Sequence, residues 1–317
     1  MSEPYLVGVI GARGHTGKEL LRLIGEHPEL MLAYASSREF AGRKVTEITP
    51  ELHDDIEFEA LDASAATKRR ADAVILALPD AAAGPFVDAF ERDTANRILI
   101  DLSADYRFDD DWAYGLPELH RDKIKRQKRI ANPGCYATAM QLAVAPMVEH
   151  LAGVPSVFGV SGYSGAGTTP SPRNDAERLE NNLMAYALTG HKHEREATRH
   201  LGAPVRFTPH VHPAFRGILV TVHIPLNKKF DQASLKAIYE KAYDGEALIR
   251  LQDEAPELKD GTNHRGVLIG GFSVSESGDH AVVVAAEDNL LKGAAVQAIQ
   301  NLNLALGLPE LMGITST

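Results

Sequence analysis

The first hundred residues alternate between short apolar runs and segments with apolar residues at helical spacing. Such spacing over His15–Glu26 predicts an amphipathic helix between two apolar runs, Leu6–Ile10 and Leu30–Ala35. Two further runs, Ala73–Leu78 and Ile98–Ile100, do not alternate, as expected for parallel strands covered on both faces. The strand–helix–strand order predicts an α/β domain with a doubly wound parallel sheet of Rossmann type.

The second half of the chain shows a different pattern. Apolar and polar residues alternate along Ile218–Ile224, which is typical of an antiparallel strand with one buried face. Further strand-like segments are Val157–Val160, Val205–Thr208, Val267–Ser275 and Ala281–Ala286. Helical spacing occurs at Ala176–Ala187, Ser234–Ala242 and Leu290–Leu306. We therefore expect a second, α+β domain with a mostly antiparallel sheet, and the polar segment Asp109–Arg129 as the crossover into it.

Composition and charge narrow the class of protein. Of 317 residues, 44% are hydrophobic and 24% are charged, as in soluble globular proteins with room for two domains. The net charge of −10 argues against a nucleic acid or an anionic membrane as a partner. Apolar runs are too short to span a bilayer, and the first residues lack signal-peptide features. The only cysteine, Cys135, excludes an intrachain disulfide, so we expect a cytoplasmic protein.

A glycine-rich turn follows the first predicted strand and precedes the first predicted helix. Its glycines are spaced GxxGxxG, which departs from the usual GxGxxG spacing of dinucleotide sites. Glycines allow the backbone to approach a pyrophosphate, and the helix N-terminus binds its charge. A merely tight turn is the alternative. The predicted nucleotide-binding residues are Gly11, Arg13, Gly14, His15, Thr16 and Gly17.

The end of the second predicted strand bears on the choice between NAD and NADP. The position where NAD-binding proteins place a ribose-binding acid holds Ser36, Ser37 and Arg38. The absence of an acid and the presence of an arginine favour binding of the 2′-phosphate of NADP. The alternative is that this segment is an ordinary polar loop with no role in cofactor binding. We expect NADP as the cofactor.

Cys135 lies where a turn, Asn132-Pro133-Gly134, meets an apolar helical pattern. A helix N-terminus lowers the pKa of a thiol, because its N–H groups and dipole favour the thiolate. The alternative is a small buried residue without chemistry. The context therefore makes Cys135 a candidate nucleophile.

A histidine-rich segment, His191 to Glu196, follows later in the chain. It lacks the HExxH and C-x-x-C spacings of metal sites, so no metal is predicted. Either it is a solvated run of charges, or His191 or His193 is the acid/base partner of Cys135, oriented by Glu196.

Two further polar loops could bind an anion. The segment Ser161–Thr169, which includes Ser164 and Gly165, is rich in hydroxyls and backbone donors, although a flexible turn would have the same composition. Arg107 follows a predicted strand at the sheet edge where ligands bind. It is either a bidentate ligand for an oxyanion or a structural partner of Asp105.

Taken together and in order, these segments resemble the N-acetyl-gamma-glutamyl-phosphate reductase family, a branch of the aspartate-semialdehyde dehydrogenase superfamily. The resemblance runs almost from end to end. It rests on six motifs: Gly11–Gly17, Asp101–Arg107, Asn132–Tyr136, Ser161–Gly167, His191–Glu196, and Asp288–Ala295 followed by Gln297 and Asn301.

The resemblance implies NADPH-dependent reduction of an acyl phosphate to an aldehyde through a thioacyl intermediate on Cys135. It implies that His193, or less readily His191, is the acid/base group supported by Glu196. Asn289 would contact the cofactor, and the substrate would contact Arg107, Asn132, Ser161, Ser164 and Gly165. Residues 1–134 and 289–317 would form a discontinuous NADP-binding domain, with 135–288 as the catalytic and dimerisation domain. Homodimers or homotetramers are usual in the superfamily.

The histidine segment departs from the family pattern. Lys192 replaces an arginine and the usual proline is missing, whereas both histidines and Glu196 are retained. Two kinds of alternative function are compatible with the sequence. One is a related reductase that acts on aspartyl phosphate, on an aminoadipate analogue or on a carrier-linked substrate. The other is a non-catalytic NADP-binding regulator.

Overall fold

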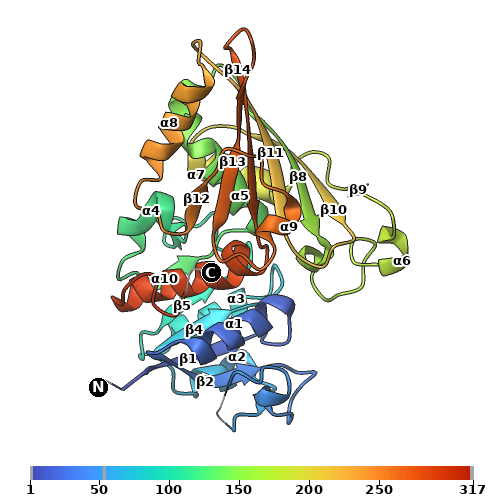
Figure 1. Cartoon of the computed structure of the whole chain (residues 1–317). Coiled ribbons are helices and arrows are strands. Elements are labelled where there is room, and N and C mark those ends of the chain that lie inside the picture. The colour runs from blue at the N-terminus through green and yellow to red at the C-terminus, as the bar shows by residue number, and fades with distance from the viewer. Residues whose placement is uncertain (1–2, 53–54, 315–317) are drawn as a thin grey trace. The chain divides into compact units, whose positions relative to one another are not determined.

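The computed structural model describes residues 3–52 and 55–314, and the chain divides into two compact units. The first unit contains the described residues up to Pro133 and those from Ala294 onward. The second contains Gly134–Gly293. In Figure 1 the colours from blue through cyan to bluish green, with the red C-terminal helix, mark the first unit.

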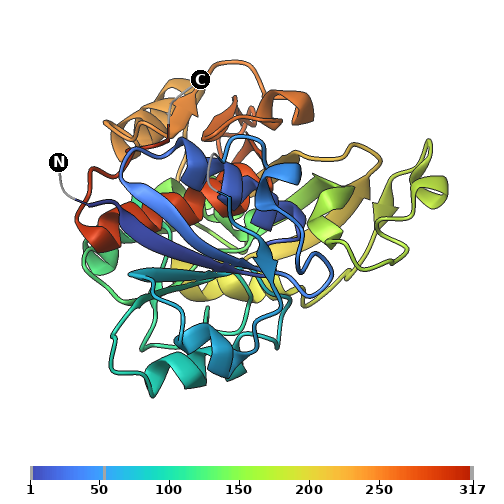
Figure 2. The same cartoon turned by 90° about the horizontal axis from the view of Figure 1, so that it is seen from below.

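The strands of the first unit form one parallel sheet. Among the described residues its order is β3-β2-β1-β4-β5-β7-β6, and Figure 2 shows several of these strands side by side in blue and cyan. The bounds are Tyr5–Ile10 (β1), Leu30–Ser36 (β2), Phe58–Glu59 (β3), Ala73–Leu76 (β4), Ile98–Asp101 (β5), Ala113–Tyr114 (β6) and Arg129–Ala131 (β7). Strands β4 and β5 are buried along their whole length, which confirms the doubly wound parallel class.

Helices cover this sheet on both faces. Helix α1 has the predicted bounds, His15–Glu26, and packs with α10 (Val296–Leu306) against the strands. On the other face α2 (Ala63–Thr67) and α3 (Gly84–Glu91) close an apolar cluster that includes Leu76 and Phe90. The 3-10 turn η1 (Val45–Glu47) and α4 (Pro117–Ile124) complete the unit. None of the helices in the described part of the chain is long and apolar enough to cross a membrane.

The second unit contains a mixed, mostly antiparallel sheet in the order β12-β13-β14-β11-β8-β10-β9. The bounds are Ser156–Gly162 (β8), Met184–Ala185 (β9), Arg206–His212 (β10), Ile218–Pro225 (β11), Ile249–Leu251 (β12), Val267–Val274 (β13) and His280–Glu287 (β14). Strand β11 is antiparallel to both of its neighbours, β8 and β14, and alternates between buried and partly exposed residues as predicted. Strands β10 and β12 pair in parallel with β8 and β13.

One face of this sheet packs against α5 (Cys135–Val144) and α8 (Gln232–Ala242). Helix α7 (Lys192–Leu201) packs on α5. The smaller elements are η2 (Ala145–His150), η3 (Tyr163–Ala166), α6 (Ala176–Leu179), α9 (Leu258–Gly261) and the π-helical turn η4 (Leu291–Ala295), which leads into α10.

Two expectations about local structure are wrong, and the helix predicted over Leu290–Leu306 ends as predicted but differs at its start. Helix α6 ends at Leu179 and is followed by β9, although helical spacing suggested a helix over Ala176–Ala187. Asn181 and Ala187 have positive φ, at 53° and 42°, a conformation that ends a right-handed helix. The predicted helix Leu290–Leu306 begins as the π-helical turn η4. Asp109–Arg129 is no crossover, because it supplies β6 and α4 to the first unit.

Candidate active site

The glycine-rich turn of the first unit is held by contacts that require glycine. Gly11 has a φ of 85°, and a Cβ there would lie 2.3 Å from the carbonyl oxygen of Ala77. Its N–H and that of Ala12 donate to the carbonyl of Ser36, at 3.1 and 3.0 Å. A Cβ at Gly17 would lie 2.6 Å from the Ala12 carbonyl, so this glycine lets α1 pack close to the turn.

The N-terminus of α1 suits an anion. Gly14 is the N-cap in an extended conformation, and no side chain caps the first turn, which contains no acidic residue. A Cβ at Gly14 would meet nothing closer than 3.8 Å. Arg13 pairs with Glu39, while His15 and Thr16 form the first turn of the helix. The first N–H groups of α1 and its dipole could therefore hold a phosphate.

The three residues predicted to select NADP, which follow or end β2, have different environments in the structure. Ser36 and Ser37 are buried, and their hydroxyls accept hydrogen bonds from the N–H groups of Leu61 and Phe40. These serines therefore shape the loop. Arg38 is exposed and forms no ion pair or side-chain hydrogen bond with the described residues, so its guanidinium is available to a ligand.

The Asp101–Arg107 loop of the first unit is built around its own polar groups. The buried Arg107 donates from Nε to the Asn132 carbonyl at 2.9 Å and from Nη2 to the Leu102 carbonyl at 2.7 Å. Asp105 accepts from the N–H groups of Ala81 and Ala83. Burial raises the pKa of Asp101 to about 6, although Ser103 and Arg107 favour its charged form. Arg107 thereby fixes the position of Asn132.

In the second unit Cys135 is the first residue of α5. Gly134 is the N-cap with an extended backbone and no capping side chain. The N–H of Gly134 instead donates to Oε1 of Glu196 at 2.8 Å. The thiol therefore lies at the positive end of a helix dipole, and a buried carboxylate holds the turn before it.

Helix α7 supplies the predicted acid/base segment. His191 is its N-cap, and Nδ1 of this side chain accepts from the N–H of His193 at 3.2 Å. Burial, with the charges of Lys192 and Arg173, lowers the pKa of His191 to about 4. His193 and Glu196 are buried on the same face of α7, because they are one turn apart. The His193 ring lies 6.2 Å from the ring of Tyr136, the residue after the thiol.

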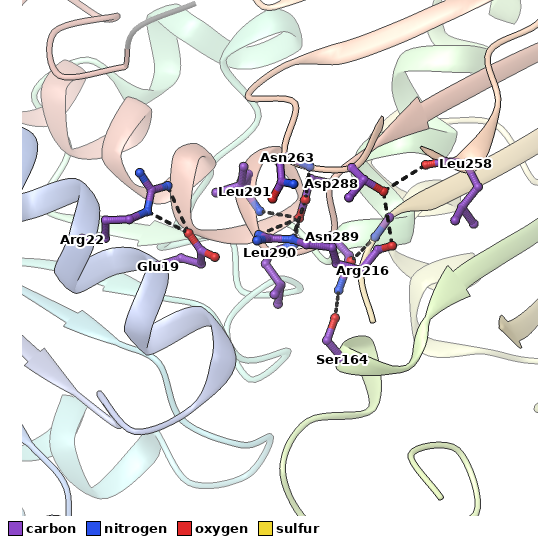
Figure 3. A network of polar contacts seen from close by, with 12 residues as sticks. Glu19, Arg22, Ser164, Arg216, Leu258, Asn263, Asp288, Asn289, Leu290 and Leu291 are labelled. Carbon is purple, nitrogen blue, oxygen red and sulfur yellow. Dashed lines mark hydrogen bonds and ion pairs between the residues drawn. The ribbon is translucent and has the colours of Figure 1, made fainter. Parts of the chain in front are cut away.

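The Ser161–Gly165 loop and Asn289 meet in one hydrogen-bonded network (Figure 3). The amide Nδ2 of Asn289 donates to the hydroxyl of Ser164 at 2.9 Å, and its Oδ1 accepts from the N–H of Gly217 at 2.8 Å. A Cβ at Gly165 would lie 3.4 Å from Oγ of Ser161. The structure thus brings Asn289 to Gly217 and to the loop that holds Ser161, Ser164 and Gly165.

The adjacent Asp288 is fully buried and anchors this network. Its carboxylate pairs with Arg216, with Nε to Oδ2 at 2.6 Å and Nη2 to Oδ1 at 3.1 Å. It also accepts from the N–H groups of Asn263 and Leu290, at 2.7 and 2.8 Å (Figure 3). These bonds fix the segment after β14 that carries Asn289.

Two family models match the chain. The semialdehyde dehydrogenase NAD-binding domain matches residues 6–127, and the semialdehyde dehydrogenase dimerisation domain matches residues 135–289. N-acetyl-gamma-glutamyl-phosphate reductase of Xanthomonas axonopodis pv. citri (strain 306) is 54% identical over 312 residues, which cover 98% of this chain and 99% of that protein. The chain belongs to the N-acetyl-gamma-glutamyl-phosphate reductase family. The protein of that name from Xylella fastidiosa (strain 9a5c) is 51% identical and covers 98% of this chain and 93% of its own length.

These matches confirm the resemblance inferred from the motifs, and they make the chain an oxidoreductase of the semialdehyde dehydrogenase class. Solved structures share the fold. Aspartate semialdehyde dehydrogenase II of Vibrio cholerae, complexed with ASA, gives a TM-score of 0.78 at 19% identity, over 96% of this chain and 99% of that one. The Candida albicans aspartate semialdehyde dehydrogenase with NADP gives a TM-score of 0.71 at 16% identity, over 96% of this chain and 99% of that one.

Three residues near the thiol of this family member were missed by sequence reasoning. Burial, and then the charge of Cys135, raises the pKa of Tyr186 to about 12. The guanidinium carbon of Arg173 lies 4.9 Å from the centre of the Tyr186 ring. A Cβ at Gly293 would lie 2.7 Å from Cβ of Cys135. No local motif marks Arg173 or Tyr186, and the motif Asp288–Ala295 contains Gly293 without indicating its contact with Cys135, because that contact joins segments that are distant in the sequence.

Proposed function

We propose that this protein reduces N-acetyl-gamma-glutamyl phosphate to N-acetylglutamate semialdehyde and phosphate with NADPH, in arginine biosynthesis. The observation that carries the mechanism is the placement of Cys135 at the N-terminus of α5, with Glu196 bonded to the residue before it. The related proteins from Xanthomonas and Xylella carry the name of this activity.

The thiol is the nucleophile in this mechanism. The helix dipole of α5 favours the thiolate, and Sγ attacks the γ-acyl carbon of the substrate. A bond from sulfur to the acyl carbon forms while the carbon–oxygen bond to phosphate breaks, and phosphate leaves with that electron pair. The result is a thioester on Cys135, whose carbonyl accepts hydride more readily than a carboxylate does. Release of the aldehyde returns the electron pair to sulfur.

His193 is the acid/base group in this proposal. It lies on the buried face of α7 that also carries Glu196. His191 is the less suitable residue, because its Nδ1 caps α7 and its pKa of about 4 keeps it neutral near pH 7. Glu196 acts by holding the turn at Gly134.

The residues of the first unit fit a dinucleotide. The uncapped N-terminus of α1 and the turn Gly11–Gly17 would hold the pyrophosphate. When bound, NADPH supplies the hydride that reduces the thioester carbonyl. Arg38 supports NADP over NAD, because its exposed guanidinium stands at the end of β2 where a ribose-binding acid is absent.

Two groups of polar residues are assigned to the substrate. Asn132, fixed by Arg107, would bind the substrate phosphoryl group with that arginine. The acyl chain of the substrate would contact the loop that holds Ser161, Ser164 and Gly165. Asn289 stabilises this loop through its hydrogen bond to Ser164.

A homodimer or homotetramer and a cytoplasmic location complete the proposal. The sheet face opposite α5 leaves Phe158 43% exposed and Leu219 and Val284 partly exposed, an apolar surface that a second copy would cover. A catalytic thiol is best preserved in a reducing compartment.

A steady-state assay in the oxidative direction tests the function. N-acetylglutamate semialdehyde, phosphate and NADP should give rapid turnover, and aspartate semialdehyde should be a far poorer substrate. Cys135→Ser should abolish turnover while leaving NADP affinity nearly unchanged. Preference for aspartate semialdehyde would refute the substrate assignment, and turnover by the serine variant would refute the nucleophile.

A further inference from the structure

Arg173 is a partly buried cation in the second unit that the mechanism above does not use. Its guanidinium carbon lies 4.9 Å from the centre of the Tyr186 ring, in a cation–π contact. Within the described residues, no carboxylate forms an ion pair with it. The segment that carries it is ordered by its own bonds, because Asn174 accepts from Ser171 and donates to the carbonyls of Gly167 and Thr169.

A chain of ring contacts links Arg173 to His193, the proposed acid/base group. The Tyr186 ring lies 5.7 Å from the ring of His191, which lies 4.8 Å from the ring of His193. Tyr186 is also close enough to Cys135 for the negative charge of the thiolate to raise its pKa. Arg173 in turn contributes a positive charge that lowers the pKa of His191. The guanidinium therefore lies next to the catalytic residues of its own unit, one side chain beyond Tyr186.

A guanidinium held in this way is prepared for an oxyanion. Arg173 also donates a hydrogen bond to the Tyr186 hydroxyl. A guanidinium has five N–H donors, so others remain for a ligand, where a pair of them matches a carboxylate in a bidentate fashion. The proposed substrate has two oxyanions, the phosphoryl group on the reacting carbon and the α-carboxylate at the other end of the aliphatic chain. The thiol must be close to the first, so an arginine one side chain further away fits the second.

We propose that Arg173, held against Tyr186, binds the α-carboxylate of the substrate and thereby selects for it. This assignment rests on the proposed function. It identifies a specificity-determining residue in the catalytic unit, separate from Arg107, which is bonded to backbone carbonyls of the first unit.

The test compares two aldehydes in the oxidative assay. N-acetylglutamate semialdehyde carries the carboxylate, and 4-acetamidobutanal has the same chain without it. Arg173→Ala should lower kcat/KM for the first about 10- to 100-fold, the range for loss of a charge-assisted hydrogen bond, and change that for the second by less than about twofold. Arg173→Lys should give an intermediate loss, because lysine keeps the charge without the bidentate geometry. Arg178→Ala removes an exposed arginine from the same segment and should change neither value.

Each other result contradicts the proposal. Equal losses for both aldehydes would mean that Arg173 supports the fold or the thiol instead of the carboxylate. If Arg173→Ala raised the KM for phosphate and left the KM for the semialdehyde unchanged, Arg173 would bind the phosphoryl group instead. Unchanged kinetics would show that it binds neither. The proposed function is tested separately on the unaltered enzyme, because it fails if that enzyme does not turn over N-acetylglutamate semialdehyde or prefers aspartate semialdehyde.

Discussion

The carboxylate of Glu196 accepts a hydrogen bond from the backbone N–H of Gly134, at 2.8 Å, one residue before Cys135. Glu196 is 1% exposed, so neither group can exchange this partner for bulk water. Gly134 is the N-cap of α5, and the bond therefore sets where the helix, and with it the thiol, begins.

Replacing Glu196 by alanine should leave the Gly134 N–H without its acceptor and destabilise the protein by about 1–3 kcal/mol. Cys135 is the only cysteine, so its alkylation by iodoacetamide reports on the thiol alone. We expect Glu196→Ala to alter the pH profile of alkylation and to lower kcat. Glu196→Gln keeps an acceptor oxygen and should restore most of the stability in urea unfolding. An alanine variant as stable and reactive as the unaltered protein would contradict this positioning role.

Gly293 is expected to tolerate no side chain. A Cβ there would lie 2.7 Å from Cβ of Cys135 and 3.1 Å from Oε1 of Glu287, so the thiol would have to move. Gly293→Ala should cost about 1–3 kcal/mol of stability through overpacking, and displacement of the nucleophile should lower kcat about 10- to 100-fold. Gly153→Ala is the matched control, because its nearest contact, Pro225, would lie at an ordinary 3.4 Å. Equal kinetics for the two variants would argue against a close contact at Cys135.

His191 should make stability depend on pH. Its pKa is about 4 in the folded protein, because of burial and the charges of Lys192 and Arg173, against about 6.5 when unfolded. The unfolded chain therefore binds the proton more readily, and stability is lost as the pH falls from about 6.5 to about 4. The loss amounts to about 3 kcal/mol.

His191→Asn should remove this pH dependence, since asparagine caps a helix without titrating. The free energy of unfolding in urea, measured for both proteins between these pH values, isolates the contribution as a difference. Near neutral pH the variant should retain most of kcat, whereas His193→Asn should lose far more. Parallel pH curves, or the reverse kinetic ranking, would refute the division of roles between the two histidines.

Arg38 is expected to select the phosphorylated cofactor. Arg38→Ala should weaken NADPH binding about 10- to 100-fold by removing a charge-assisted contact with the 2′-phosphate. NADH binding should change by less than about twofold. Arg92→Ala removes an exposed charge elsewhere on the same unit and serves as the control. Titration of cofactor fluorescence measures both affinities, and an equal effect on NADPH and NADH would place the 2′-phosphate elsewhere.

Local patterns in the sequence determined most of the secondary structure and the family. Helix α1 has the predicted bounds because its apolar spacing and the preceding glycine turn act within a few residues. The alternation along β11 likewise anticipates its one buried face. The helix predicted over Ala176–Ala187 is wrong beyond Leu179. Apolar spacing does not reveal where the backbone turns, as it does at Asn181 and Ala187.

Tertiary structure alone decided what surrounds the thiol. Local sequence patterns predict that Cys135 begins a helix and that two histidines and Glu196 follow later in the chain. Only packing of α7 on α5 gave Glu196 the N–H of Gly134 as a partner. Only the tertiary fold placed Tyr186 against Arg173 and within reach of the charge of Cys135. Such contacts depend on the positions of whole elements, and a side chain carries no local signal of its distant neighbour.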